Sequence, residues 1–304
     1  MQIRIHEVAP RDGLQNESSV IPTEVKVEFI HRLVAAGCTD IEVTSFVRPR
    51  WIPQLADAAE VVARLPRAEG VTYWGLVPNQ RGLDRAVDCG LDAVATFMSA
   101  SETHNNKNLN RTRRESLAAL RGVIGSAAGA GLQVRAYIST VFGCPYEGLV
   151  SPENTLNLAE ELLDAGASFI ALGDTTGMAN PTQVAELVGL LTDHGVPLDR
   201  LALHMHDTRG TALANVLAGF QAGIRHFDAS VAGLGGCPYA PGASGNLASE
   251  DLTYMLGQMG HETGISLERL ADAGLFIEEA LGRELPGRYH LFHRSSRARA
   301  EESA

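Results

Sequence analysis

The chain of 304 residues repeats one local pattern along most of its length. An Ala- and Leu-rich stretch ends at a glycine, and a short run of β-forming residues follows, as in LVAAGCTDIEVTSF around Gly37 and LLDAGASFIALGD around Gly166. Glycine suits the position after a helix because the left-handed conformation there costs it little. The runs that follow are mostly apolar on both faces, which is typical of parallel strands covered by helices. The pattern therefore indicates alternating helices and strands.

Eight strands are expected when one at the start of the chain and one in the middle are added. They lie near residues 3–9, 40–46, 71–77, 93–99, 133–140, 169–174, 201–207 and 226–232. Eight alternating units favour an α/β fold of the (β/α)8 TIM-barrel type, although periodicity alone leaves an open doubly wound sheet possible. Residues 264–286 are expected to add C-terminal helix. We therefore expect one barrel domain over 1–286 and a flexible, polar tail over 287–304.

The composition fits a globular protein with a large core. About 45% of the residues are apolar, and 25 basic against 36 acidic side chains give a net charge of −11. A nucleic-acid binder would carry a basic patch, and a membrane span needs roughly 20 uncharged apolar residues in a row. The N-terminus has no apolar signal core, and four cysteines make no disulfide framework in a chain of this length. We expect reduced thiols and a cytoplasmic location.

Polar residues gather where the predicted strands end. A barrel carries its chemistry at the C-terminal ends of its strands. The residues concerned are Glu7, Arg11, Asp12, Gln15, Glu42, Ser45, Arg135, Tyr137, Asp174, Thr175, His204, His206, Cys237 and Asn246. Polar groups in apolar strands cost free energy unless they are paired or bind something. The sequence therefore predicts a ligand pocket at this end of the barrel.

His204 and His206 are the most specific local signal, because residues i and i+2 on a strand point to the same face. With Asp12 and the amide oxygen of Asn246 they would form a mostly hard, mixed ligand set. That set favours Mg²⁺ or Mn²⁺, although Zn²⁺, Co²⁺ or Fe²⁺ would also accept it. The alternative is that one histidine is an interior residue bonded to Asp207. The spacing alone leaves both interpretations open.

Arg11 precedes Asp12 directly, which has an ordinary explanation as a surface ion pair. Beside a metal, however, Arg11 could neutralise an enolate or carboxylate oxygen. Glu42 could fix Arg11 or a metal ligand from behind.

Two cysteines follow strands in the same tetrapeptide, Gly-Cys-Pro-Tyr, at Cys144 and Cys237. Cys237 lies in a glycine-rich loop that could close over a substrate and carry a reactive group. A small buried thiol is the ordinary alternative. The spacing does not decide between the two cysteines. The glycine-rich loop also lacks the G-x-G-x-x-G pattern of dinucleotide-binding sites.

These segments together resemble the 3-hydroxy-3-methylglutaryl-CoA lyase family, over about residues 3–282. The resemblance is carried by EVAPRDGLQNE (7–17), IEVTSF (41–46), GCPYEG (143–148), GDTTG (173–177), HMHDTRGTALAN (204–215) and VAGLGGCPYAPGASGNLASEDL (231–252). The last segment is specific to the lyase. The Arg-Asp pair and the His-x-His motif are shared with isopropylmalate and homocitrate synthases and with oxo-acid aldolases.

The resemblance implies a metal-dependent lyase that splits 3-hydroxy-3-methylglutaryl-CoA into acetyl-CoA and acetoacetate, a reaction of leucine catabolism. It implies Mg²⁺ or Mn²⁺ bound by Asp12, His204, His206 and Asn246. The implied catalytic residues are Arg11, Asp12, Glu42, His204 and Cys237. Substrate-binding residues are expected at Arg11, Gln15, Ser45, Arg135, Tyr137 and Thr175. We expect CoA contacts at Arg48, Lys107 and Asn108, and a homodimer.

Three other functions stay open from the sequence. The first is a lyase for a longer branched 3-hydroxyglutaryl-CoA, which would use the same loops with a different pocket. The second is a Claisen-type synthase, although such synthases usually carry a long C-terminal regulatory region and this chain ends soon after the barrel. The third is a non-catalytic scaffold, against which every position of the family's chemistry holds a suitable residue.

Overall fold

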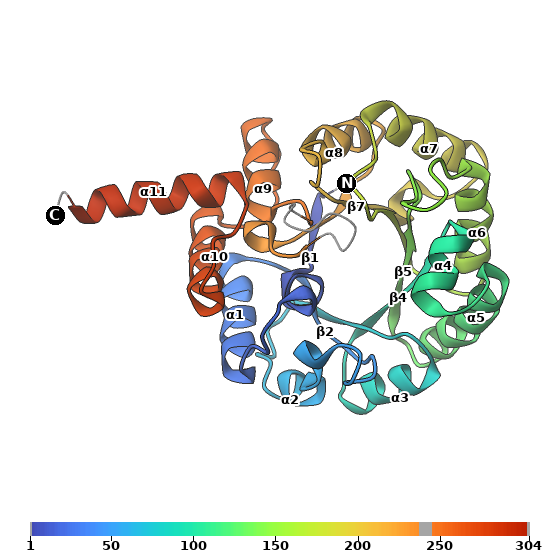
Figure 1. Cartoon of the computed structure of the whole chain (residues 1–304), viewed down its shortest axis with the longest axis horizontal. Helices are drawn as coiled ribbons and strands as arrows, with labels where there is room; N and C mark the ends of the chain where they lie inside the picture. The colour runs from blue at the N-terminus through green and yellow to red at the C-terminus, as the bar shows by residue number, and fades with distance from the viewer. Residues whose placement is uncertain (1, 237–244, 303–304) are drawn as a thin grey trace.

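The computed structural model describes residues 2–236 and 245–302 and folds them around a closed barrel of parallel strands (Figure 1). The strands follow chain order from β1 to β8, and β8 closes the barrel by pairing with β1. They span Arg4–Glu7 (β1), Asp40–Ser45 (β2), Thr72–Leu76 (β3), Ala93–Ser99 (β4), Gln133–Ser139 (β5), Phe169–Asp174 (β6), Leu201–Met205 (β7) and His226–Ala229 (β8). The predicted (β/α)8 barrel is confirmed.

A ring of helices surrounds the barrel in Figure 1. They span Thr23–Ala36 (α1), Ala58–Ala63 (α2), Gln80–Asp88 (α3), Glu102–Leu109 (α4), Arg113–Gly129 (α5), Pro152–Asp164 (α6), Pro181–Asp193 (α7), Ala212–Gln221 (α8), Ser249–Gln258 (α9), Leu267–Leu281 (α10) and Arg288–Glu302 (α11). No helix of the described residues is both long enough and apolar enough to cross a membrane.

The repeated glycine ends helices as the sequence pattern predicts. Gly37 follows α1 with φ 99°, in the left-handed region, and its N–H bonds back to the carbonyls of the last turn. Strand β2, which comes next, is buried along its whole length. Burial on both faces explains the continuous apolar runs, because helices cover the outside of a parallel sheet.

Two clusters of apolar side chains hold the barrel together. The larger lies between strands and helices and includes Phe29, Ile30 and Leu33 of α1. The smaller consists of one residue from each of the strands β3 to β7, namely Leu76, Ala95, Tyr137, Ala171 and Ala202. These side chains fill the barrel interior beneath its mouth, so the polar groups above them have a packed floor.

The extra C-terminal helix expected over 264–286 is present as α10, which packs beside α1. The structure differs from the expected loose tail, because residues 288–302 form α11, which extends away from the barrel (Figure 1). Its polar side chains bind acidic residues of α10: His290 bonds to Glu278 at 2.8 Å, and His293 and Arg297 both bond to Asp272. The sequence therefore showed that this segment is polar, but it did not show which acidic residues its side chains contact.

Candidate metal and active site

A cavity of about 520 Å³ opens at the C-terminal ends of the strands. Its polar lining residues include Arg11, Asp12, Gln15, Thr175, His204 and His206. Its apolar lining residues are Val47, Trp51, Ile52, Leu76, Pro78, Phe97 and Leu109. A mostly apolar wall with a few convergent polar groups is typical of sites for small molecules.

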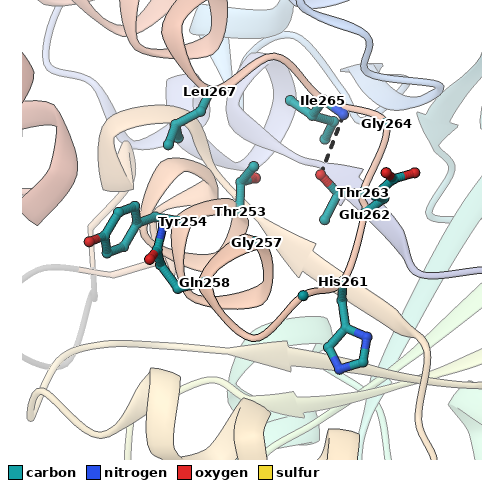
Figure 2. Close-up of a pocket in the computed structure, with 11 residues that line it drawn as sticks. Thr253, Tyr254, Gly257, Gln258, His261, Glu262, Thr263, Gly264, Ile265 and Leu267 are labelled. Carbon is teal, nitrogen blue, oxygen red and sulfur yellow. Dashed lines mark hydrogen bonds between the residues drawn. The ribbon is translucent and has the colours of Figure 1, made fainter.

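A second cavity, of about 560 Å³, lies outside the barrel between the end of α9 and the start of α10 (Figure 2). Its lining includes Thr253 and Gln258 of α9 and His261, Glu262 and Thr263 of the loop that follows, all drawn in Figure 2. Among the described residues, the grouping of three or more metal-binding side chains is found at the barrel mouth and not here. The mouth is therefore the candidate active site.

Asp12, His204 and His206 bring their ligand atoms within 4.8 Å of one another. Asp12 lies in a single π-helical turn, Ala9–Gly13, in which the N–H groups of residues 11–13 converge on the carbonyl of Val8 after β1. The Nε2 atoms of His204 and His206, at the end of β7, are 3.3 Å apart. The ends of β1 and β7, which are separated in the barrel only by β8, thus deliver one carboxylate and two imidazoles to one point.

The charges of this cluster fit a divalent cation. Although burial opposes it, the Arg11 charge lowers the pKa of Asp12, so this carboxyl is ionised. Burial and then the neighbouring His204 lower the pKa of His206 to about 3, which leaves its imidazole neutral with a lone pair available. A carboxylate and neutral imidazoles are the forms that bind metals.

Asn246 lies beside the cluster as predicted, and its Nδ2 donates to Asp12 Oδ2 at 2.8 Å. An amide offers an oxygen in place of its nitrogen after a half turn about its last bond. Asn246 can therefore serve as a fourth protein ligand only in the turned orientation. The donor set of two nitrogens and two oxygens then suits a divalent metal ion.

Arg11 is buried and held from two sides. Its Nε donates to Glu42 Oε1 and its Nη1 to Asp12 Oδ1, both at 2.5 Å. Tyr137 and His6 bond to the other oxygen of Glu42, at 2.8 and 3.3 Å. Burial opposes ionisation of Glu42, but the charge of Arg11 and the contacts with His6 together outweigh it and lower the pKa of Glu42. Glu42 thus fixes Arg11 from behind, and it does not line the cavity among the residues described.

The partner of His204 is Asp228 of β8. His204 Nδ1 lies 3.1 Å from Asp228 Oδ2, and Arg135 of β5 forms an ion pair with Asp228 Oδ1. Asp207, the partner considered in the sequence analysis, instead accepts from the N–H of Ala212 at the start of α8.

The predicted substrate residues divide into two groups. Arg11, Gln15, Tyr137 and Thr175 line the mouth cavity. Ser45 and Arg135 do not: Ser45 Oγ is buried 3.5 Å from the carbonyl of Leu76, and Arg135 lines a small cavity at the opposite end of the barrel, near Arg4.

Of the three predicted CoA contacts, one lines the mouth cavity and the other two lie near aromatic rings. Asn108 lines the mouth cavity. The Lys107 ammonium sits 4.0 Å above the ring of Tyr146, and the Arg48 guanidinium lies 5.5 Å from the ring of Trp51.

The two cysteines that the sequence could not separate differ in what is described of them. Cys237 lies outside the described residues. Cys144 is buried, with its Sγ 3.0 Å from Ser101 Oγ.

Sequence reasoning missed four residues that shape the site. They are His6 and Asp228, which bond to Glu42 and His204, and Trp51 and Phe97, which line the cavity wall. An aspartate inside the apolar run His226–Ala229 was the available signal for Asp228, because a buried charge requires a partner. The aromatic residues gave no signal that distinguishes a cavity wall from a core.

Comparison with known proteins bears on the whole chain. The HMGL-like family model matches residues 2–277. Hydroxymethylglutaryl-CoA lyase YngG of Bacillus subtilis is 52% identical over 97% of this chain and 98% of its own length. The mitochondrial hydroxymethylglutaryl-CoA lyase of Bos taurus is 48% identical over 93% of this chain and 86% of its own.

A solved structure with ligands gives the same result. An HMG-CoA lyase from Acinetobacter baumannii, in complex with coenzyme A and 3-methylmalate, superposes with a TM-score of 0.89 at 40% identity, covering 94% of this chain and 93% of that one. Fold, cavity and relatives therefore agree. The chain belongs to the HMGL-like family and, within it, to the hydroxymethylglutaryl-CoA lyases, which are metal-dependent carbon–carbon lyases.

Proposed function

We propose that this chain cleaves 3-hydroxy-3-methylglutaryl-CoA into acetyl-CoA and acetoacetate at the mouth of its barrel. The observation that carries the proposal is the convergence of Asp12, His204 and His206 with the fixed Arg11 on one cavity. Relatives about half identical to this chain over nearly its whole length bear the name of that activity.

The metal would be Mg²⁺ or Mn²⁺, held by Asp12, His204, His206 and Asn246. When bound, such an ion would polarise the tertiary hydroxyl of the substrate and orient its carboxylate.

The chain's own residues account for the remaining proton and charge movements. Asp12 or His204 takes the proton of the tertiary hydroxyl as the C2–C3 bond breaks and acetoacetate forms. The electron pair of that bond passes to the thioester, whose oxygen becomes an enolate, and the Arg11 guanidinium neutralises it. Because Glu42 and Asp12 already hold Arg11 in place, its charge needs little reorganisation during the reaction. Cys237 gives a proton to the acetyl carbon.

The acyl-CoA arm would leave along the apolar wall of the cavity. Trp51 and Asn108 line this cavity, Trp51 is 64% exposed with Arg48 beside it, and Lys107 precedes Asn108 in the chain. A cationic rim suits the phosphates of CoA, although the chain as a whole is acidic. We extend the proposal to a cytoplasmic homodimer that takes part in leucine degradation, and light scattering of the purified chain would report the dimer.

The deciding experiment is an assay of acetoacetate release by metal-stripped protein, with and without added Mg²⁺ or Mn²⁺. We expect metal-dependent cleavage that Cys237→Ala lowers by about 10²- to 10⁴-fold, as is typical for loss of a general acid. Cys144→Ala changes the other copy of the Gly-Cys-Pro-Tyr tetrapeptide, where the thiol contacts Ser101. This variant should retain the cleavage activity. No cleavage by folded, metal-loaded protein would reject this substrate, and longer branched acyl-CoAs would then be assayed.

A further inference from the structure

Three buried side chains from separate strands form one hydrogen-bonded row behind the metal-binding cluster. Arg135 of β5 pairs with one oxygen of Asp228 on β8, and the other oxygen lies 3.1 Å from His204 Nδ1 on β7. The side chains of Arg135 and Asp228 are 3% and 0% exposed. Neither residue lines the mouth cavity. We propose that Asp228 and Arg135 are positioning residues, which together hold His204 in the one neutral tautomer that can bind metal through Nε2.

The carboxylate of Asp228 sets the direction of the hydrogen bond. Asp228 is fully buried against the Arg135 guanidinium in an ion pair, so it is a carboxylate and only accepts. His204 Nδ1 must then carry the hydrogen, which leaves a lone pair on Nε2 when the ring is neutral. That Nε2 faces His206 Nε2 at 3.3 Å and belongs to the group that includes Asp12. A carboxylate behind a ligating histidine is a recurrent way to fix its tautomer.

Arg135 completes the arrangement because a guanidinium only donates. It occupies Oδ1 of Asp228 and leaves Oδ2 to His204. The backbone helps to fix this geometry, since His204 and Asp228 are direct partners in the register of β7 and β8. Arg135 does not line the mouth cavity, and a positioning role does not require it to do so. The proposal rests on the metal site of the proposed function.

The hydrogen-bonded row predicts that the effect of replacing Asp228 by asparagine depends on whether Arg135 is present. In Asp228→Asn the amide can present its oxygen to only one neighbour. Arg135 requires an acceptor, so the oxygen turns to Arg135 and the NH₂ group turns to His204. Nδ1 then becomes an acceptor, the hydrogen moves to Nε2, and the lone pair needed for metal is lost. The same type of substitution in a catalytic Asp–His pair acts through the wrong tautomer.

The test measures Mn²⁺ affinity by titration calorimetry without substrate. We expect Asp228→Asn to weaken Mn²⁺ binding by about 10- to 100-fold. Arg135→Met, which keeps the length of the side chain but removes its donors, should bind within a few-fold of the unchanged protein. In the double variant the amide is free to accept from Nδ1, so affinity should recover at least about fivefold relative to Asp228→Asn.

Asp57→Asn is the matched control, since Asp57 belongs to another ion pair with a buried partner, Lys26, away from the site. It should leave the affinity unchanged. Affinity in Asp228→Asn equal to that of the unchanged protein would overturn the proposal. So would a folded double variant that binds no better than Asp228→Asn, because a merely structural role for Asp228 predicts that two losses add.

A second measurement separates this proposal from the proposed function. Two-bond ¹H–¹⁵N spectra of the metal-free protein at a pH where His204 is neutral report its tautomer directly. We expect hydrogen on Nδ1 in the unchanged protein and on Nε2 in Asp228→Asn. If the tautomer does not change, the inference fails whatever the enzyme cleaves. If the tautomer changes but no acyl-CoA is cleaved, the inference stands and the proposed function fails.

Discussion

Two buried carboxyl groups beneath the loop after β8 form no ion pair among the described residues. Glu7 accepts from the N–H groups of Ala9 and Val231 and from Ser249 Oγ, and Glu250 accepts from the N–H of Ala232 at 2.7 Å. Burial raises the pKa of Glu7 to about 7 and that of Glu250 to about 8. They differ from Glu42 and Asp228, whose charges face a buried arginine. The protein therefore has two buried carboxyl groups with raised pKa values at one place and ion pairs at another.

The neutral carboxyl of Glu250 predicts a fall in stability at high pH. Its pKa in the folded state is raised above the usual 4.5, so its contribution is complete below pH 4.5 and is lost as the pH rises through about 8. Glutamine stays neutral at every pH. Glu250→Gln should therefore be less sensitive to pH, and its free energy of unfolding relative to the unchanged protein should rise by about 2 kcal/mol between pH 6 and pH 9.

Urea unfolding at the two pH values measures this difference. Glu186→Gln, at an exposed position of α7, should follow the unchanged protein at both. Equal pH dependence in Glu250→Gln and the unchanged protein would mean that Glu250 is ionised in the fold.

Residues with a short-range signal could be predicted, and residues with only a long-range partner could not. Asp12 stands next to Arg11, and His204 and His206 are two positions apart, so local spacing marked them as candidate site residues. Asp228 and His6 depend on partners 24 and 36 residues away. Those contacts exist only once the strands are paired in register, which no local pattern encodes.

At the scale of elements, glycines decide both where helices end and how closely they pack. The glycines that end helices explain why the eight predicted strands agree with the structure to within a few residues. The close packing of helices at a glycine was not visible in the sequence: Gly274 in α10 lies against His290 of α11 and Glu250 of α9. The position of α11 depends on this close contact between helices. The sequence of α11 is polar and aperiodic, so it gave no indication that this segment forms a docked helix.

This close approach predicts opposite effects of one substitution in two helices. A Cβ at Gly274 would lie 2.9 Å from His290 Nδ1 and 3.0 Å from Glu250 Oε1, too near for both. A Cβ at Gly189, inside α7, meets nothing within 4 Å. Gly274→Ala should destabilise the protein by about 1–3 kcal/mol through overpacking, whereas Gly189→Ala should stabilise it by about 0.5–1 kcal/mol through helix propensity.

Thermal unfolding of the two variants provides the comparison, since the chemical change is the same. Gly274→Ala should unfold below the unchanged protein and Gly189→Ala above it. Two shifts of the same sign would show that α10 and α11 are not packed as described.

At the scale of the whole molecule, the site joins the first and the last strand of the barrel. Strand β1 pairs with β8, and Asp12 after β1 accepts from Asn246, which is 234 residues later in the chain. The count of eight strand patterns favoured a closed barrel, in which the first and last strands meet, over an open sheet. The walls of the cavity depend on loops after β2 to β4, whose conformation follows from packing that the sequence does not show locally. Prediction was thus strongest for the frame and for the residues at its strand ends.

A ligand that spans the closure should stabilise the whole fold. An ion bound by Asp12, His204, His206 and Asn246 binds the folded chain, because only folding brings together residues so far apart in sequence. Mn²⁺ at 100 times its dissociation constant would then add about 2.7 kcal/mol to the free energy of unfolding. For a domain of this size we expect the unfolding temperature to rise by about 4 °C over protein treated with a chelator. His206→Ala should lose most of this rise, and His261→Ala, at the outer cavity beside Phe220, should keep it. An equal rise in His206→Ala would place the stabilising ion elsewhere on the molecule, because loss of a ligand at the barrel mouth must weaken binding there.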